Sequence, residues 1–177
     1  MPDSTAQPPI STSILPATRE QEPILSNLLE LYIHDFSEIL HLDLGPDGRF
    51  GYNNLSHYWT QPDHHPFLIT VDDQLAGFAF VKKATALAGD DDSSQQQVWD
   101  MAEFFVVRAH RKRGLGLSAT HQLWQLFPGP WQVRVMDKNL PALHFWQRAI
   151  DTFTGKSIAP ALIDRDEKRW AVFTFQS

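Results

Sequence analysis

The segment Glu103–Leu123 reads EFFVVRAHRKRGLGLSATHQL, and it decides how the chain folds. An apolar run typical of a buried strand ends at Val107, and five basic or imidazole side chains follow within six residues. A Gly-Leu-Gly turn beginning at Gly114 then precedes apolar residues at helical spacing. A glycine turn at a helix start leaves backbone N–H groups unpaired at the positive end of the helix dipole. With basic side chains beside it, the segment predicts a phosphate-binding turn between a strand and a helix.

Three other interpretations of this turn compete. A solvated surface loop is the simplest, because runs of charge usually face water. A P-loop would need Gly-Lys followed by Ser or Thr, which the segment lacks. A dinucleotide-binding motif fits better, since Gly114–Ala119 matches G-x-G-x-x-A and Asp137 follows. However, six residues separate Val107 from Gly114, whereas that motif has its first glycine tight against the strand.

The composition describes one acidic, cysteine-free domain. The chain has 177 residues, 42% of them hydrophobic, with a net charge of −6 and no cysteine. Thiolate catalysis and cysteine metal sites are therefore excluded, and the acidic balance argues against general nucleic-acid binding. No apolar run has the length of a membrane helix, and the first residues lack the features of a secretory signal. We expect a cytoplasmic protein without nucleic-acid or membrane partners, whose polar residues 1–12 form a disordered tail.

Outward from the turn, the pattern predicts alternating strands and helices. The order is a short strand, two helices, three antiparallel strands, a helix, a strand, a helix and one or two final strands, which is an α+β fold. A polar, low-complexity loop spans 88–97 and interrupts this pattern. The expected strands lie near Ile14 and at Phe67–Val71, Leu75–Lys82, Trp99–Val107, Trp131–Val135 and Trp170–Phe175; the expected helices begin near Glu20, at His34 (to Leu44), at Leu115 (to Phe127) and after an Asn139 cap.

Two motifs point to a known family. Val106–Gly116 resembles the acetyl-coenzyme-A signature of the GNAT N-acetyltransferase superfamily, whose core Arg/Gln-x-x-Gly-x-Gly/Ala corresponds to RKRGLG, starting at Arg111. Asn139–Trp146, NLPALHFW, resembles the later helix motif Asn-x-x-Ala-x-x-Phe-Tyr. The stretches AEFFV, FPGPW and NLPALHFW are similar to those of an uncharacterised subgroup of predicted acetyltransferases.

The resemblance implies a fold and an activity. The fold would be a single GNAT domain over 13–177, with a twisted, mostly antiparallel sheet of six to seven strands and about four helices. The strands 99–107 and 131–135 would splay apart. The implied reaction is direct transfer of an acetyl group from acetyl-coenzyme A (acetyl-CoA) to a primary amine of a small molecule or protein. A binding-only acetyl-CoA sensor and an NAD-dependent oxidoreductase are the alternatives, and dimers are frequent in the superfamily.

The resemblance also assigns cofactor-binding residues. The pantetheine arm would lie in the splay, the pyrophosphate would sit on backbone N–H groups of the glycine turn, and an N–H near Phe105 or Val106 would stabilise the oxyanion. The expected cofactor-binding residues are Phe105, Val106, Val107, Arg108, Arg111, Arg113, Gly114, Leu115, Gly116, Leu117, Ser118, Asn139, Phe145 and Trp146.

Glu103 is the expected catalytic base. It is an acid inside an otherwise apolar strand, where desolvation would raise its pKa toward a useful range. Many relatives carry the acid one position earlier, where this chain has Ala102, so a β-bulge would be needed to turn Glu103 to the same face. Trp146 stands where relatives have a tyrosine as the acid for the leaving thiolate, and indole cannot serve. His144, Tyr58 and Tyr32 are alternative proton donors.

The acceptor amine is expected to bind against the N-terminal helices. Aromatic side chains with a carboxylate could hold a small cationic amine, although such aromatics are also common in protein cores. Adjacent His64 and His65 lack further clustered ligands, so we expect a polar turn there and no metal. The expected acceptor-binding residues are Tyr32, Asp35 and Tyr58, with His34, Phe36, Tyr52 and Trp59 nearby.

Overall fold

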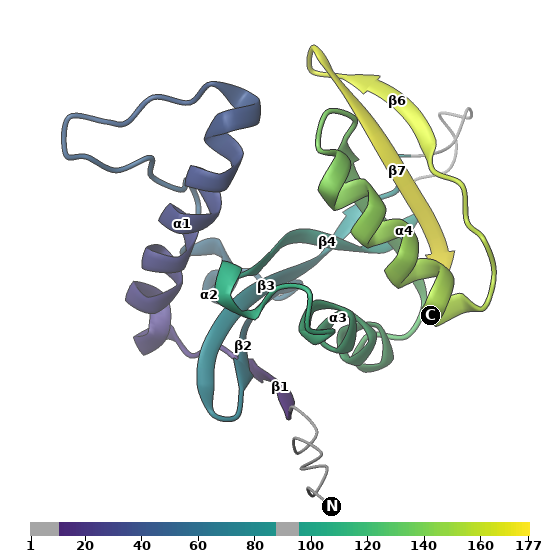
Figure 1. Ribbon diagram of the computed structural model, residues 1–177, viewed down its shortest axis with the longest axis horizontal. Helices are drawn as coiled ribbons and strands as arrows, with labels where there is room; N and C mark the ends of the chain where they lie inside the picture. The colour runs from purple at the N-terminus through teal and green to yellow at the C-terminus, as the bar shows by residue number, and fades with distance from the viewer. Residues whose placement is uncertain (1–10, 88–95) are drawn as a thin grey trace, which may run out of the picture.

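A computed structural model describes residues 11–87 and 96–177. Within these residues, seven strands form one sheet in the order β1-β2-β3-β4-β5-β7-β6, and four α-helices pack on it (Figure 1). The α+β class and the mostly antiparallel sheet are therefore confirmed. Most of the 88–97 loop and residues 1–10 of the expected tail lie outside the described residues. Thr12, which the sequence placed in that tail, pairs with Val71 in the sheet.

The first half of the sheet is an antiparallel meander. A hairpin joins β2 to β3 through Asp72 and Asp73, both with positive φ angles of 46° and 60°, as a two-residue turn of matching twist requires. His64 and His65, expected in a turn, instead open β2. The bounds are β1 Thr12–Pro16, β2 His64–Val71, β3 Gln74–Thr85 and β4 Gln97–Val106.

The second half of the sheet joins the first through a very short parallel contact. Only Trp99 with Trp131 and Asp100 with Gln132 pair between β4 and β5, and the two strands then part. The splay expected from the resemblance is therefore present. The strands of this half are β5 Pro130–Met136, β6 Ala161–Arg165 and β7 Lys168–Gln176.

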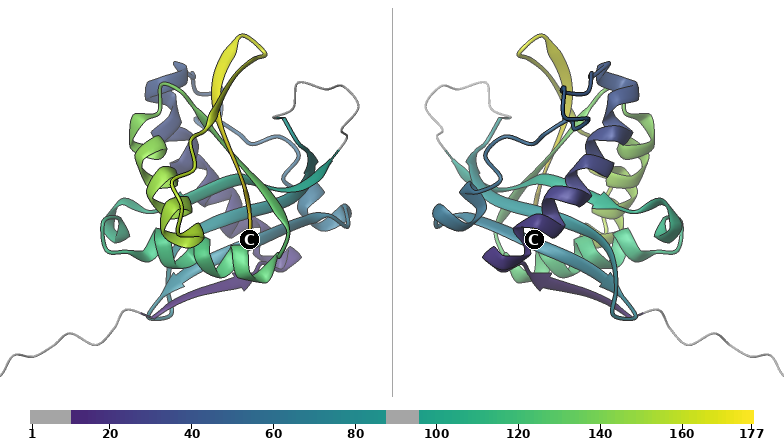
Figure 2. Two further views of the ribbon diagram at one scale, coloured as in Figure 1. Left: turned by 90° about the vertical axis from the view of Figure 1, so that its right-hand side faces the viewer. Right: turned by 90° about the vertical axis from the view of Figure 1, so that its left-hand side faces the viewer.

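The helices cover opposite faces of the sheet, and each face has its own apolar core (Figure 2). Leu25, Leu28 and Leu29 of α1 pack on Phe78 and Phe80 of β3. On the other face, α3 and α4 bury apolar residues against the alternate strand positions, as the two-residue period of a strand requires. The helices are α1 Glu22–Leu40, α2 His57–Thr60, α3 Leu115–Leu126 and α4 Leu140–Thr154; short 3₁₀ turns span Arg19–Gln21 and Arg108–His110.

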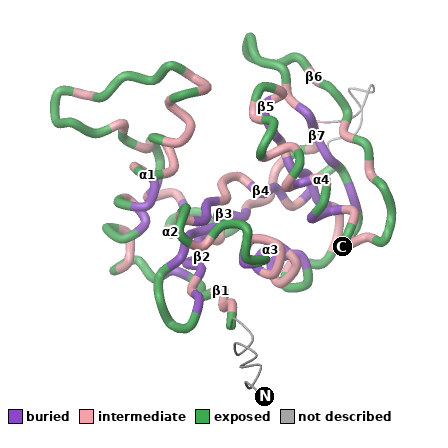
Figure 3. Tube along the Cα trace, viewed as in Figure 1, coloured by how far each residue is buried: buried purple, intermediate pink, exposed green. Residues whose placement is uncertain are grey.

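One helix prediction was wrong. A second helix from His34 to Leu44 was expected, but α1 runs without a break to Leu40. The polar pair His34-Asp35 interrupts the apolar stripe without any helix-breaking residue, so the backbone continues. Exposed residues dominate the loop 41–56 that follows, and also β6 (Figure 3).

Candidate active site

The basic turn leads directly into the N-terminus of α3. Gly114 caps the helix with φ of 82°, a left-handed conformation that glycine adopts without strain. The first intrahelical bond runs from the Ser118 N–H to the Gly114 carbonyl at 3.0 Å. The N–H groups of Leu115–Leu117 therefore lack intrahelical acceptors and form the anion-binding end of the helix. Ser118 was expected to offer its N–H too, but that group is already paired.

Gly116 has a different reason for being glycine. A Cβ there would lie 3.0 Å from the Phe145 ring, so the absence of a side chain lets α3 approach α4 closely. Phe145 in turn stacks on Phe104 of β4, with ring centroids 5.7 Å apart and an interplanar angle of 12°. Trp146 is 7% exposed and packs edge-on against the same Phe104. These aromatic rings form the α3/α4 side of the splay.

The edge of β4 directs the peptide group of Val106 into the splay. The Val107 N–H donates to the Ala76 carbonyl of β3 at 2.9 Å. Because peptide groups alternate along a strand, the N–H and C=O of Val106 point away from β3, while those of Phe105 point toward it. Of the two residues expected to stabilise an oxyanion, Val106 therefore faces the splay.

Two of the expected cofactor-binding arginines are held by a carboxylate. Asp35 of α1 accepts hydrogen bonds from Arg108 at 2.6 Å and from Arg111 at 2.5 Å, and the Arg111 Nε donates to the Val106 carbonyl at 2.7 Å. Partial burial would raise the pKa of Asp35, but the hydrogen bonds and charges of Arg111 and Arg108 outweigh it and lower this pKa. Asp35, expected to bind the acceptor, thus ties α1 to the basic turn. Arg113 forms no ion pair with any described carboxylate.

Glu103 lies at a bulge in β4. Phe80 of β3 pairs with Glu103 while Val81 pairs with Met101, so Ala102 is the extra residue. The bulge directs the Glu103 carboxylate to the α1 face, where it accepts hydrogen bonds from the hydroxyls of Tyr32 at 2.5 Å and Tyr52 at 3.1 Å. The bulge that the sequence required in order to turn Glu103 to this face is therefore present.

The environment of Glu103 suits a proton acceptor. Burial raises the pKa of Glu103, and the hydrogen bonds from Tyr32 and Tyr52 together with the Arg134 charge oppose the rise only in part. Burial, with the Glu103 charge, also raises the pKa of both tyrosines well above the usual range. The two phenols therefore stay protonated and act as donors to the carboxylate.

Three other residues expected at the site lie in different surroundings: one in the core, one at a helix cap and one at the surface. Tyr58 is only 6% exposed and packs on Phe80 at a centroid distance of 4.1 Å, which makes it part of the α1-side core. Asn139 caps α4 by accepting a hydrogen bond from the Ala142 N–H at 3.2 Å, as the sequence predicted. His144, one candidate proton donor, is exposed on α4.

Sequence reasoning missed an ion pair at the point where the strands part. Arg134 of β5 donates to both carboxylate oxygens of Asp100 in β4, from Nε at 3.0 Å and Nη2 at 2.7 Å. Asp100 is fully buried. The available signal was a pair of opposite charges inside two apolar strands, which rarely occurs unless they meet.

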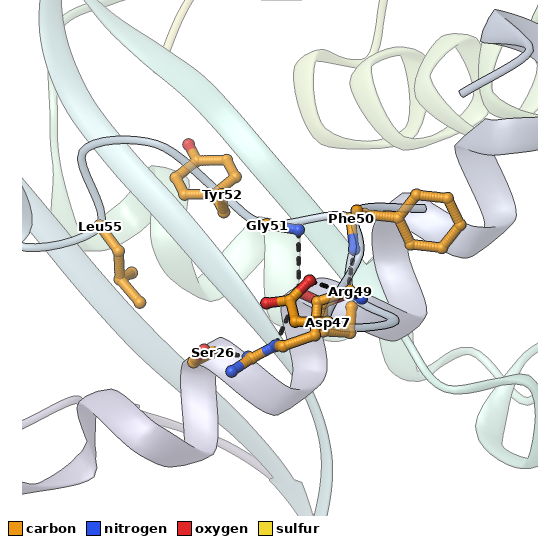
Figure 4. A pocket seen from close by; sticks show the side chains of 9 residues that line it. Ser26, Asp47, Arg49, Phe50, Gly51, Tyr52 and Leu55 are labelled. Atoms are coloured by element: carbon orange, nitrogen blue, oxygen red, sulfur yellow. Dashed lines mark hydrogen bonds and ion pairs between the residues drawn. The ribbon is translucent and has the colours of Figure 1, made fainter. Parts of the chain in front are cut away.

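A pocket of about 390 Å³ lies between α1 and the loop 41–56 (Figure 4). Glu30 of α1 anchors this loop, accepting the N–H groups of Phe50 at 2.8 Å and Gly51 at 3.0 Å, and the Arg49 Nε at 3.4 Å. Tyr52 lines this pocket and also donates to Glu103. The loop therefore supplies one of the two phenols that bind the Glu103 carboxylate, a role the sequence did not reveal.

Within residues 11–87 and 96–177, no group of three or more His, Asp or Glu side chains is arranged to hold a metal ion. Across those same residues, no helix is both long enough and apolar enough to cross a bilayer.

Several solved structures with a similar fold are described as acetyltransferases. An acetyltransferase from Thermus thermophilus matches with a TM-score of 0.65 and 14% identity, over 94% of this chain and 97% of its own. Arabidopsis thaliana NAA60, in complex with a bisubstrate analogue, gives 0.60 and 15%, over 94% and 98%. The aminoglycoside acetyltransferase AAC(6')-Ib, in complex with coenzyme A, gives 0.64 and 14%, over 94% and 95%. Among curated proteins, none matches this chain.

These identities are low enough that the structural likeness establishes the fold alone. The sequence carries the assignment further, because the model of the acetyltransferase (GNAT) family matches residues 25–150, well over half of the chain. That range includes the glycine turn, the splayed strands and Glu103. The chain therefore belongs to the GNAT family of acetyltransferases.

Proposed function

We propose that the protein is an acetyl-CoA-dependent N-acetyltransferase that acetylates a primary amine by direct attack, with Glu103 as the base. One observation carries this proposal: a partly buried carboxylate held by two phenols stands on the strand that leads into the glycine turn at the N-terminus of α3. A strand that carries a proton acceptor and leads into an anion site suits transfer of an acyl group from a phosphate-bearing donor to an amine.

The described residues fit acetyl-CoA as the donor. The free N–H groups of Leu115–Leu117 suit its pyrophosphate, and Arg113 adds a cation that no described carboxylate neutralises. The Val106 peptide group offers backbone pairing to the pantetheine arm, once the Arg111 side chain releases its carbonyl. Support also comes from the fold relatives, because NAA60 has been captured with acetyl-CoA and AAC(6')-Ib with coenzyme A.

The chemistry follows from these groups. Glu103 accepts one proton from the ammonium form of the acceptor, and the neutral nitrogen then forms the new bond to the acetyl carbon. The Val106 N–H stabilises the negative charge that develops on the thioester oxygen; the carbon–sulfur bond then breaks, and the second proton lost by the nitrogen passes to the departing thiolate. An alkyl thiol has a pKa near ~8.5, so the thiolate is a fair leaving group without the tyrosine that Trp146 replaces.

A second function, binding of acetyl-CoA without turnover, is favoured by Trp146. This side chain is buried in the α3/α4 core, so no phenol stands at that helix position to protonate the thiolate. An NAD-dependent oxidoreductase is disfavoured, because β4 pairs antiparallel with β3 and keeps only two parallel pairs with β5.

The first experiment is calorimetric titration of the protein with acetyl-CoA. We expect saturable binding that Gly114→Glu abolishes, because the new carboxylate would stand at the anion site. Gly155→Glu is the matched control: Gly155 also caps a helix with positive φ, at 67°, and has open space where a Cβ would lie, but it stands at the far end of α4. Equal loss in both variants, or binding of NAD instead, would overturn the assignment.

The second experiment separates enzyme from sensor. Release of free thiol from acetyl-CoA is followed across a panel of primary amines, with product identified by mass. Amine-dependent release that requires Glu103 supports the enzyme. Tight acetyl-CoA binding without acetylated product from any amine supports the sensor.

A further inference from the structure

The ion pair of Asp100 and Arg134 occupies a distinctive place in the sheet. Pairing between β4 and β5 stops at Asp100 and Gln132, and Arg134 then reaches back from β5 to bind both oxygens of Asp100. The pair therefore bridges the two strands at the apex of the splay. Its two parallel hydrogen bonds fix the guanidinium in one orientation, which a single contact would not do.

The Arg134 side chain lies on the same face of the sheet as Glu103. Val133 and Val135 point into the α3/α4 core, so the side chain of Arg134 between them points to the α1 face. Glu103 reaches that same face, where Tyr32 of α1 binds it. The guanidinium also lies 5.9 Å from the centroid of the Trp170 ring in β7.

The groups around Glu103 form a small electrostatic set. Tyr32 of α1 and Tyr52 of the loop donate to it, and the Tyr58 hydroxyl of α2 adds its dipole nearby. Asp100, which precedes Glu103 on β4, and Arg134 of β5, which is bound to Asp100, supply the charges, one of each sign. Arg134 is thus the one cation in this set, and it stands against the burial that disfavours an ionised carboxylate.

We propose that Arg134 is a positioning residue for Glu103: fixed by Asp100 where β4 and β5 part, its guanidinium keeps the Glu103 carboxylate ionised and ready to accept a proton. The inference rests on the proposed role of Glu103 as the base. It assigns Asp100 the task of holding the cation in place, while neither Asp100 nor Arg134 contacts the reacting atoms.

The test measures Glu103 directly and needs no turnover. Protein with ¹³C-labelled glutamate is titrated by NMR, and the Glu103 carboxyl signal is assigned by its loss in Glu103→Gln. In Arg134→Gln the Glu103 midpoint should move to higher pH, because the cation is gone. In Arg134→Lys the midpoint should return toward the original, because the charge remains although the two-bond geometry is lost.

A purely structural role predicts a different result. Melting temperature would fall in Arg134→Gln while the Glu103 midpoint stayed where it was, and this outcome overturns the proposal. If Arg134→Gln does not fold, the neutral pair Asp100→Asn with Arg134→Gln replaces it, since two amides can still bond across the gap. The midpoint should then rise by less, because a negative charge has been removed as well; an unchanged or lower midpoint refutes the idea.

Enzyme activity gives an independent test of the coupling between Arg134 and Glu103. If the protein is an acetyltransferase, the acidic limb of its kcat/KM profile should move with the NMR midpoint, while acetyl-CoA affinity stays unchanged. If the midpoint moves but no amine is acetylated, the proposed function fails and the coupling of Arg134 to Glu103 stands.

Discussion

At the scale of single residues, the site is governed by competition around one carboxylate. Burial raises the pKa of Glu103 and so disfavours the ionised form that a general base needs. Two phenols and the Arg134 guanidinium oppose this by favouring the ionised form. The net direction is a raised pKa, so these three groups limit a rise that burial drives.

Replacing Glu103 by Gln tests the base directly. We expect turnover to fall by about 10²–10⁴-fold, the usual contribution of a general base. The acetyl-CoA dissociation constant should hardly change, since Glu103 lies on the α1 face, away from the α3 N-terminus. Steady-state kinetics and calorimetry on the same preparation make the measurement. Unchanged turnover would show that another group accepts the proton.

Replacing Tyr32 by Phe tests whether the Tyr32 hydroxyl stabilises the ionised Glu103 carboxylate. This phenol stabilises the ionised carboxylate, so its loss should raise the pKa of Glu103 further. The base must be ionised to work, and the acidic limb of the kcat/KM profile should therefore shift to higher pH, with activity lost first at low pH. Tyr58→Phe is the control, because the Tyr58 hydroxyl makes no hydrogen bond to Glu103 in the structure. A shift to lower pH in Tyr32→Phe would contradict the account.

At the scale of elements, sequence predicted best where local signals agreed. Helix α4 was predicted because the Asn139 cap and an apolar stripe coincide; the structure adds Gly155 as its C-cap. Strand β6 stayed uncertain, because its five residues, ALIDR, are mostly exposed and have no apolar alternation. The contact of Tyr52 with Glu103 joins residues 51 positions apart and depends on how a loop docks, which no local pattern encodes.

The docking of the loop 41–56 on α1 can be tested separately. Glu30→Ala removes the acceptor for the Phe50 and Gly51 N–H groups. Each hydrogen bond to a charged acceptor is worth about 1.5–3 kcal/mol, so exchange of these two amides should accelerate at least about tenfold. Turnover should also fall, because Tyr52 belongs to this loop and would lose its fixed position beside Glu103. Hydrogen exchange followed by NMR makes the measurement.

A matched control comes from the same helix. Glu38 is exposed on α1 and holds no loop amide, so Glu38→Ala should leave both amides protected. Equal protection in Glu30→Ala and Glu38→Ala would mean that packing of the loop, and not the carboxylate, holds it in place.

At the scale of the whole molecule, the sheet consists of two halves with a narrow junction. Strands β1–β4 form one half and β5, β7 and β6 the other, and two residue pairs join them. The ion pair of Asp100 and Arg134 forms a further link between the halves. Helices α3 and α4 also pack on residues of both halves. A ligand that pairs with the open edge of β4 would therefore supply contacts that the protein itself leaves unmade.

Acetyl-CoA should stabilise the whole domain as a consequence. A ligand at 100 times its dissociation constant adds about 2.7 kcal/mol, which for a chain of this size corresponds to a rise in melting temperature of about 5–10 °C. Thermal unfolding with and without acetyl-CoA makes the measurement, with NAD at equal concentration as the comparison. Gly155→Glu should keep the rise and Gly114→Glu should lose it, since only the second places a negative charge at the start of α3. An equal rise with NAD, or a rise that survives Gly114→Glu, would mean that the stabilising ligand is held somewhere other than the glycine turn.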